Sequence, residues 1–135
     1  MILPDSSAWI PYLRAADHPL RWTMRRLIEQ EADIAVTEPV VMELLAGARG
    51  DREAREIRVR LLALPLLRVE GLADFERAAL LYGTCRREGE TIRSLVDCLI
   101  AVVAIREGAE ILHHDADFDA IARHTELQIH RPDTT

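Results

Sequence analysis

Five acidic residues stand at positions where a soluble protein rarely places a charge. Each one follows an apolar, strand-like segment or lies inside an apolar helical run: Asp5, Glu43, Asp97, Asp115 and Asp117. Carboxylates held together in a partly buried place repel one another and lose hydration, so a cation has to compensate them. No set of His or Cys residues has metal-binding spacing, and all-oxygen ligands favour Mg²⁺ or Mn²⁺ over zinc. The pattern therefore indicates a divalent metal site.

Three of these acids also fit purely structural roles at helix starts. Asp5 precedes Ser6 and fits the N-cap of the first helix. Asp115 or Asp117 fits the N-cap of the last helix, with solvent-facing neighbours. All three acids nevertheless come directly after apolar strand segments, and two acids two residues apart after a strand can turn toward one ion. Capping and metal binding are therefore both open for this group.

The other two acids lie inside helical segments that have almost no polar face. The run 95–105 contains Asp97 as its only charge, so this helix is expected to be buried nearly all round. Ser94-x-x-Asp97 also fits a capping box, in which the acid bonds back to the amide of the cap residue. Glu43 lies in the apolar run 40–46, although a structural Glu is usually placed on a solvated face. We interpret both acids as functional.

The elements that must position these acids alternate between short strands and helices. Strands are expected at 2–4, 34–36, 66–69, 111–113 and 127–130. Helices are expected at 7–13, 19–31, 38–47, 52–64, 72–88, 94–107 and 117–124, with Thr37 capping the third. This alternation predicts an α/β fold with a short parallel sheet of about 4–5 strands and helices on both faces. Sites in such folds form beyond the carboxyl ends of the strands.

Composition sets the remaining limits. The chain has 135 residues, of which 49% are hydrophobic, and we expect one domain over 1–135. We expect a cytoplasmic protein without a membrane span, because the chain has no long apolar stretch and its start lacks signal-peptide features. Cys85 and Cys98 are expected to be buried thiols. All seventeen basic residues are Arg, and the net charge of −6 argues against a broad nucleic-acid-binding surface but not against a nucleic acid held locally.

Four segments resemble the PIN-domain nucleases, and most closely the VapC-type toxins of bacterial toxin–antitoxin pairs. They are residues 5–9, 38–47, 91–101 and 113–119, and the resemblance covers essentially the whole chain. It implies a single PIN-like domain and a metal-dependent endoribonuclease that cleaves RNA phosphodiesters with metal-activated water. It also implies a cognate VapB-like antitoxin that neutralises the toxin, and a toxin homodimer.

The resemblance assigns roles to particular residues. It implies an acidic quartet and a fifth acid, in the order Asp5, Glu43, Asp97, Asp115 and Asp117. Mg²⁺ or Mn²⁺ would be held by all of these except Glu43. Ser6 matches a hydroxyl that orders the site. Arg93 matches a basic position near the substrate phosphate, and the alternative is an Arg solvated at a helix start. Pro4 departs from the family pattern, and its missing amide is expected to weaken pairing of the first strand.

Two other functions are compatible with acids at strand ends. An aspartyl-phosphate enzyme, either a phosphatase or a receiver domain, also uses Mg²⁺ in an α/β fold, but it normally needs a lysine that this chain lacks. A catalytically inactive PIN-like binding module is the third candidate, and the complete acid set argues against it. The apolar segment 61–67 and the aromatic residues Trp9, Tyr12 and Trp22 offer surface for an antitoxin, with ordinary core packing as the alternative.

Overall fold

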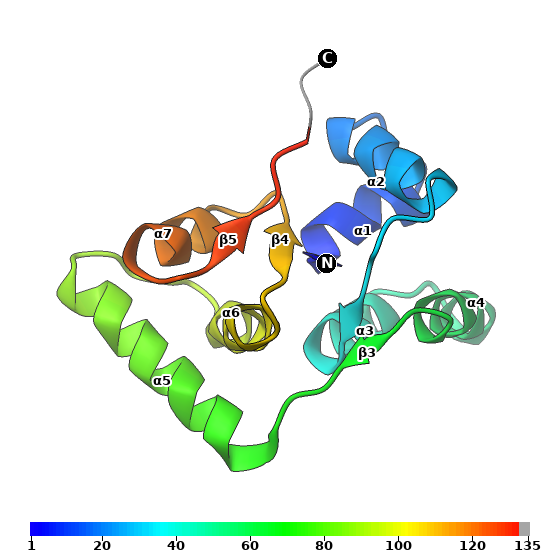
Figure 1. The fold of residues 1–135 in the computed structure, drawn as a ribbon. Helices are drawn as coiled ribbons and strands as arrows, with labels where there is room; N and C mark the ends of the chain where they lie inside the picture. The colour runs from blue at the N-terminus through cyan, green and yellow to red at the C-terminus, as the bar shows by residue number, and fades with distance from the viewer. Residues whose placement is uncertain (133–135) are drawn as a thin grey trace.

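The computed structural model describes residues 1–132, which form short strands alternating with helices (Figure 1). The strands are β1 (Ile2–Pro4), β2 (Val36–Thr37), β3 (Leu66–Leu67), β4 (Glu110–Leu112) and β5 (Gln128–Ile129). The helices are α1 (Ser6–Leu13), α2 (Pro19–Glu29), α3 (Glu38–Ala46), α4 (Asp51–Leu62), α5 (Gly71–Arg87), α6 (Leu95–Glu107) and α7 (Ala116–His124). The expected order of elements is confirmed, although the strands are mostly shorter than expected.

All the strand pairs within residues 1–132 are parallel. β4 lies between β1 and β5, and β2 pairs with β3. A single bridge between Ile2 and Ile34 joins the two groups, which gives the spatial order β3-β2-β1-β4-β5. The prediction of a short parallel sheet is therefore confirmed, but hydrogen bonding divides it into a three-stranded and a two-stranded part.

Pro4 explains why the sheet divides beside β1. The amide of Ile2 donates to the Asp33 carbonyl (2.8 Å) and the Ile2 carbonyl accepts from Ala35 (2.9 Å), so these groups face the β2 side. Pro4, two residues later, presents its nitrogen to the same side but has no hydrogen to donate. On the other side, the amide of Asp5 donates to the Leu112 carbonyl at 2.9 Å. Pairing is thus weakened only toward β2, and Asp5 stays anchored to the end of β4.

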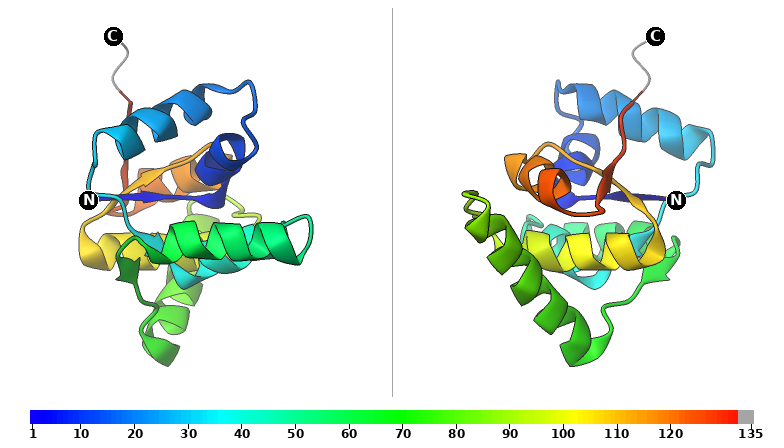
Figure 2. Two further views of the ribbon diagram at one scale, coloured as in Figure 1. Left: turned by 90° about the vertical axis from the view of Figure 1, so that its right-hand side faces the viewer. Right: turned by 60° about the vertical axis from the view of Figure 1, so that its left-hand side comes forward.

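Helices cover both faces of the sheet (Figure 2). α1 and α2 lie on one side, whereas α3, α4, α5 and α6 lie on the other. The expectation that α6 is buried nearly all round is confirmed, because each residue from Asp97 to Ala104 is buried. Cys85 and Cys98 are buried free thiols, as expected. Among residues 1–132, no helix combines the length and the apolar character that crossing a membrane requires.

The aromatic residues divide between core and surface. Trp9 is buried in the core and Tyr12 packs against it, which confirms the core reading for both. Trp22 remains half exposed on α2. Thr37 takes the N-cap position of α3 as expected, but its buried hydroxyl makes no capping hydrogen bond.

Candidate functional site

The five acids come from four separate segments. Asp5 follows β1 directly, and Asp115 and Asp117 follow β4 at the start of α7. Asp97 lies in the first turn of α6, and Glu43 lies in α3. Because β1 and β4 are parallel neighbours, their carboxyl ends meet at one edge, where α6 and α3 bring the other two acids.

Three of the acids lie close enough to share one ion. Asp97, Asp115 and Asp117 each offer a carboxylate oxygen, and these oxygens all lie within 4.8 Å of one another. Asp97 is only 4% exposed, whereas Asp115 is partly exposed. Asp5, only 3% exposed, lies near enough for its charge to act on both Asp97 and Glu43. The structure thus places a closely spaced triplet beside Asp5, with Glu43 adjoining it.

Burial and mutual repulsion change how these carboxyls hold protons. Burial raises the pKa of Asp97 to about 9, helped by a hydrogen bond with Asp117 and by the negative charges of Asp5 and Asp115. Burial, followed by the charge of Asp5, also raises the pKa of Glu43, and a hydrogen bond from Ser6 partly opposes this. Without a cation, the site therefore retains protons that ordinary carboxyls would release.

A buried acid elsewhere in the chain shows the opposite behaviour. Asp74 in α5 is fully buried, but its Oδ2 accepts a hydrogen bond from Arg106 Nη2 at 2.7 Å, and its Oδ1 accepts one from Arg77. Burial alone would raise the pKa of Asp74, but the Arg106 and Glu70 hydrogen bonds and the Arg106 charge outweigh it and lower the pKa. Asp74 is thus a compensated structural acid, whereas Asp97 is not compensated in this way.

Asp5 caps a helix and still keeps one oxygen for another partner. Its Oδ2 accepts hydrogen bonds from the Ser7 amide (3.0 Å) and the Ser7 hydroxyl (2.6 Å), which confirms the N-cap reading. Its buried Oδ1 has no hydrogen-bond partner among the described residues. The Ser7 hydroxyl also accepts from the His114 amide at 2.9 Å, so it ties Asp5 to the segment after β4. Sequence reasoning missed Ser7, although the Asp-x-Ser spacing of a capping turn signals it.

The capping-box reading of Asp97 is wrong. Within residues 1–132, the Ser94 side chain makes no capping hydrogen bond to α6, and the Ser94 amide instead donates to Asp117 Oδ2 at 3.1 Å. The Arg93 amide donates to both oxygens of Asp117 at 3.1 Å. Asp117 therefore caps α6 from α7, and Asp97 Oδ2 remains buried without a hydrogen-bond partner among residues 1–132.

Two further residues named from the sequence lie at the site. The Ser6 hydroxyl donates to Glu43 Oε1 at 3.3 Å, so it orients this carboxylate. The Arg93 guanidinium lies 3.3 Å from Asp115 and 3.6 Å from Asp117, while its side chain stays 73% exposed. Arg93 therefore lies beside the acids, and its exposed side chain just before the start of α6 also agrees with the alternative of an Arg solvated at a helix start. Asp115 also caps α7 through the amide of Asp117, as the structural reading expected.

The residues present fit a divalent cation. Asp5 Oδ1 and Asp97 Oδ2 are buried oxygens without partners within the described chain, and such atoms are costly unless something compensates them. The donors are all carboxylates, the ligand type of Mg²⁺ and Mn²⁺. Burial, followed by the neighbouring acids, raises the pKa of Asp97, so a cation bound there would have to displace its proton.

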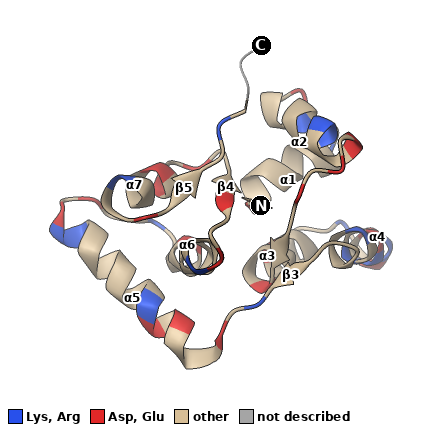
Figure 3. Cartoon of the chain, viewed as in Figure 1, with Lys and Arg blue, Asp and Glu red and all other residues tan. Residues whose placement is uncertain are grey.

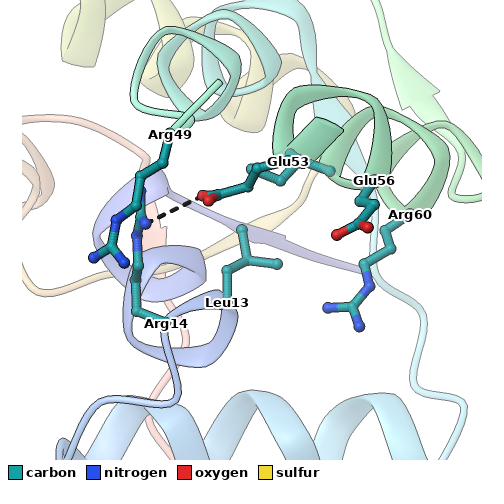
Figure 4. A pocket seen from close by; sticks show the side chains of 7 residues that line it. Leu13, Arg14, Arg49, Glu53, Glu56 and Arg60 are labelled. Atoms are coloured by element: carbon teal, nitrogen blue, oxygen red, sulfur yellow. Dashed lines mark ion pairs between the residues drawn. The ribbon is translucent and has the colours of Figure 1, made fainter. Parts of the chain in front are cut away.

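A separate groove lies between α1 and α4 (Figure 4). It encloses about 280 Å³ and is lined by Leu13, Arg14, Arg49, Glu53, Glu56, Ile57 and Arg60. The Arg14 guanidinium pairs with Glu53 at 3.1 Å across it. A smaller hollow shares Leu13, Arg14 and Glu53 and reaches Glu43, so the groove opens toward the acid cluster.

Comparison with known proteins places the chain among related sequences and folds. Residues 2–124 match the family model described as PIN domain. The chain is 50% identical over 129 residues to Ribonuclease VapC11 of Mycobacterium tuberculosis, which covers 95% of this chain and 96% of that relative. Its fold is similar to that of M. tuberculosis VapC20, a toxin described as cleaving the sarcin–ricin loop (TM-score 0.67, 22% identity, 94% of this chain and 98% of the other). It is also similar to FitAB bound to a DNA fragment (TM-score 0.73, 17% identity, covering 100% of both chains).

Proposed function

The chain belongs to the PIN domain family, and on that premise we propose that it is a VapC-type ribonuclease toxin held inactive by a VapB-like antitoxin. The observation that carries the proposal is the convergence of Asp97, Asp115 and Asp117, together with buried oxygens on Asp97 and Asp5 that have no hydrogen-bond partner among residues 1–132. The 50% identity to a protein named as a ribonuclease, over nearly the whole chain, supports the substrate class.

We propose that Mg²⁺ or Mn²⁺ is held by Asp5, Asp97, Asp115 and Asp117. Bound there, the ion would supply Lewis-acid activation of water and neutralise phosphate charge. The chain's own residues prepare that place. Ser7 holds Asp5 by its Oδ2, and Oδ1 has no hydrogen-bond partner in the described part of the chain. Asp117 fixes the start of α6, from which Asp97 projects.

Glu43 and Arg93 are the groups suited to act on substrate. Glu43 is partly exposed, has a raised pKa and is oriented by Ser6, so its carboxylate can accept a proton and hold it. Arg93 is largely exposed and pairs with Asp115 and Asp117. A metal ion bound to these two acids would neutralise their charge in place of Arg93. Its guanidinium is therefore available to exchange a carboxylate partner for an RNA phosphate.

The same proposal extends to partners and location. We propose that residues 1–135 form one cytoplasmic domain that pairs with a second copy through an apolar hollow of about 570 Å³ between α3, α5 and α6. Met42 and Phe75 line this hollow, and both are exposed large hydrophobic residues. The antitoxin would bind elsewhere, and the α1/α4 groove that opens toward Glu43 offers it surface next to the acids.

Cleavage of purified bacterial RNA tests the function. Protein freed of antitoxin should produce discrete fragments with Mg²⁺ or Mn²⁺ and none with EDTA. Asp97→Asn should lower the rate at least about a thousandfold, because it removes a charge at the point where the acids converge. No metal-dependent product under any condition would favour the inactive binding module, and phosphorylation of Asp5 by acetyl phosphate would favour the aspartyl-phosphate enzyme.

A further inference from the structure

A row of aromatic and basic side chains leads away from the acid cluster along α2. We call it the α2 stripe, and it consists of His18, Arg21, Trp22 and Arg25, with His114 at its end. The spacing of Arg21, Trp22 and Arg25 places these three residues on one face of the helix, and His18 precedes them as the N-cap of α2. That face lies opposite the one that buries Leu20, Met24 and Leu27, so the stripe is on the outside of the fold.

The stripe begins beside the site. The His114 amide donates to the Ser7 hydroxyl, which in turn donates to Asp5, and the next residue is Asp115. The His114 ring meets the His18 ring edge to face, with centroids 4.8 Å apart and planes at 75°. His18 Nδ1 accepts the Leu20 amide at 3.1 Å, so the imidazole is fixed at the start of α2.

Trp22 continues the row one helical turn further. Its side chain is 50% exposed, while the other tryptophan, Trp9, is buried in the core. The Arg21 guanidinium lies 4.6 Å from the Trp22 ring centroid and that of Arg25 lies 5.9 Å away. Two cations therefore flank an indole that the core does not use.

We propose that the α2 stripe binds the single-stranded RNA on one side of the scissile phosphate. A base stacks on Trp22, the nucleotide nearer the acids lies against His18 and His114, and Arg21 and Arg25 meet the backbone phosphates. Aromatic platforms interleaved with arginines bind single strands in this way, because every base has a face to stack and every nucleotide has a phosphate. This inference rests on the ribonuclease function proposed above.

Charge and composition favour the stripe over the other exposed hollow near the site. The net charge is −6, so an RNA strand needs a local group of cations, and α2 carries arginines (Figure 3). In the α1/α4 groove Arg14 pairs with Glu53, and none of the residues that line the groove is aromatic. It therefore lacks the surface on which a base can stack.

Binding of fluorescein-labelled octaadenylate RNA tests the inference, in an Asp97→Asn background that prevents cleavage. Trp22→Ala and Arg25→Ala should each weaken binding, by about tenfold for the tryptophan. Leu80→Ala and Arg52→Ala are matched controls, since Leu80 is also an exposed apolar helix residue and Arg52 pairs with Glu56 as Arg25 pairs with Glu29. Thermal unfolding should show all four variants folded.

A second measurement reads stacking directly. The chain has two tryptophans, so Trp9→Phe leaves Trp22 as the only one. Octaadenylate should quench its fluorescence, whereas inorganic phosphate at the same charge concentration should not. If the Trp9 variant fails to fold, the binding comparison carries the test alone.

The outcomes separate this inference from the ribonuclease function. If wild-type protein cleaves RNA while Trp22→Ala and Arg25→Ala bind octaadenylate like their controls, the stripe inference is wrong and the function stands. If Trp22→Ala weakens antitoxin binding and leaves RNA binding unchanged, the stripe is a protein-binding surface and the inference is overturned. If wild-type protein cleaves no RNA, the function fails, and loss of octaadenylate binding in Trp22→Ala still supports an RNA-binding stripe.

Discussion

Replacing Asp97 by Asn should make the metal-free protein more stable, even though it removes a residue of the proposed site. Asp97 is buried, lies close to Asp115 and Asp117, and keeps an oxygen without a hydrogen-bond partner within the described chain. Asparagine has nearly the same shape but no charge to bury. The variant therefore removes the free-energy cost of burying the Asp97 charge beside other acids and leaves the packing around residue 97 nearly unchanged.

The magnitude follows from the raised pKa. Folded Asp97 has a pKa of about 9, whereas its ordinary value is 3.8. At pH 7 Asp97 is ionised in the unfolded chain, so folding must bind a proton to it. The solution pH lies about three units above the unfolded pKa, and each unit costs about 1.4 kcal/mol of folding free energy. This sets an upper limit of about 4 kcal/mol on the gain from Asn, and water that enters the charged cavity reduces the expected gain to about 2 kcal/mol.

The sign of the pH dependence is also determined. Because the folded pKa lies above the unfolded one, the wild type has its full stability below pH 4 and loses it as the pH rises toward 9. The stability difference between Asp97→Asn and wild type should therefore be near zero at pH 4 and should grow through pH 7.

Urea denaturation in EDTA, followed by circular dichroism at pH 4, 5.5 and 7, measures this difference. Asp74→Asn is the matched control with the opposite sign. It breaks a buried pair with Arg106 and should cost about 3 kcal/mol at pH 7. An Asp97→Asn variant that is less stable than wild type at pH 7, or whose gain is the same at pH 4 and pH 7, would refute the reasoning.

Four further predictions concern the site and its partners. Ser7→Ala should lower the rate of RNA cleavage about tenfold and Ser6→Ala should lower it less, because Ser7 holds Asp5 and the segment after β4 together. Single-turnover rates of the two variants measure this, and equal losses of rate would contradict the prediction that Ser7 matters more than Ser6. Asp117→Ala should cost about 2 kcal/mol in urea denaturation, since it leaves the Arg93 and Ser94 amides unpaired, whereas Asp117→Asn should cost less. Mg²⁺ affinity should rise with pH between 6 and 8, because Asp97 must lose its proton when the ion binds. Titration calorimetry in two buffers of different ionisation enthalpy should show this proton release. An affinity that does not change with pH would argue against Asp97 as a ligand. Phe75→Arg should convert a dimer to a monomer in light scattering, with Leu80→Arg as the control on α5, and an unchanged mass would place the dimer contact elsewhere.

Local sequence patterns were sufficient to predict the elements that carry the acids. The apolar run around Asp97 predicted a buried helix, and α6 is buried along most of its length. The strand segments before Asp5 and Asp115 predicted acids at the carboxyl ends of parallel strands. The structure adds that these two strands, β1 and β4, pair directly. Pro4 predicted weakened pairing of the first strand. The sequence did not show which side of β1 would be weakened, because that depends on the neighbouring strand that the Pro4 nitrogen faces.

Contacts between distant segments were not predictable in the same way. Ser94 and Asp97 have capping-box spacing, but Asp117, 23 residues after Ser94, takes the Ser94 amide. Asp74 was not recognised as a buried acid, because its compensation comes from Arg106, 32 residues away. In both cases the partner is chosen by how helices pack, which spacing along the chain does not encode.

Anomalous diffraction from crystals of the protein soaked in Mn²⁺ is the most direct test of the central claim that acids from three segments converge on one divalent cation. We predict a peak bounded by Asp5, Asp97 and Asp115, with no peak there in Asp97→Asn crystals soaked identically. A wild-type structure with no manganese among these carboxylates, or with the same peak in the variant, would contradict it.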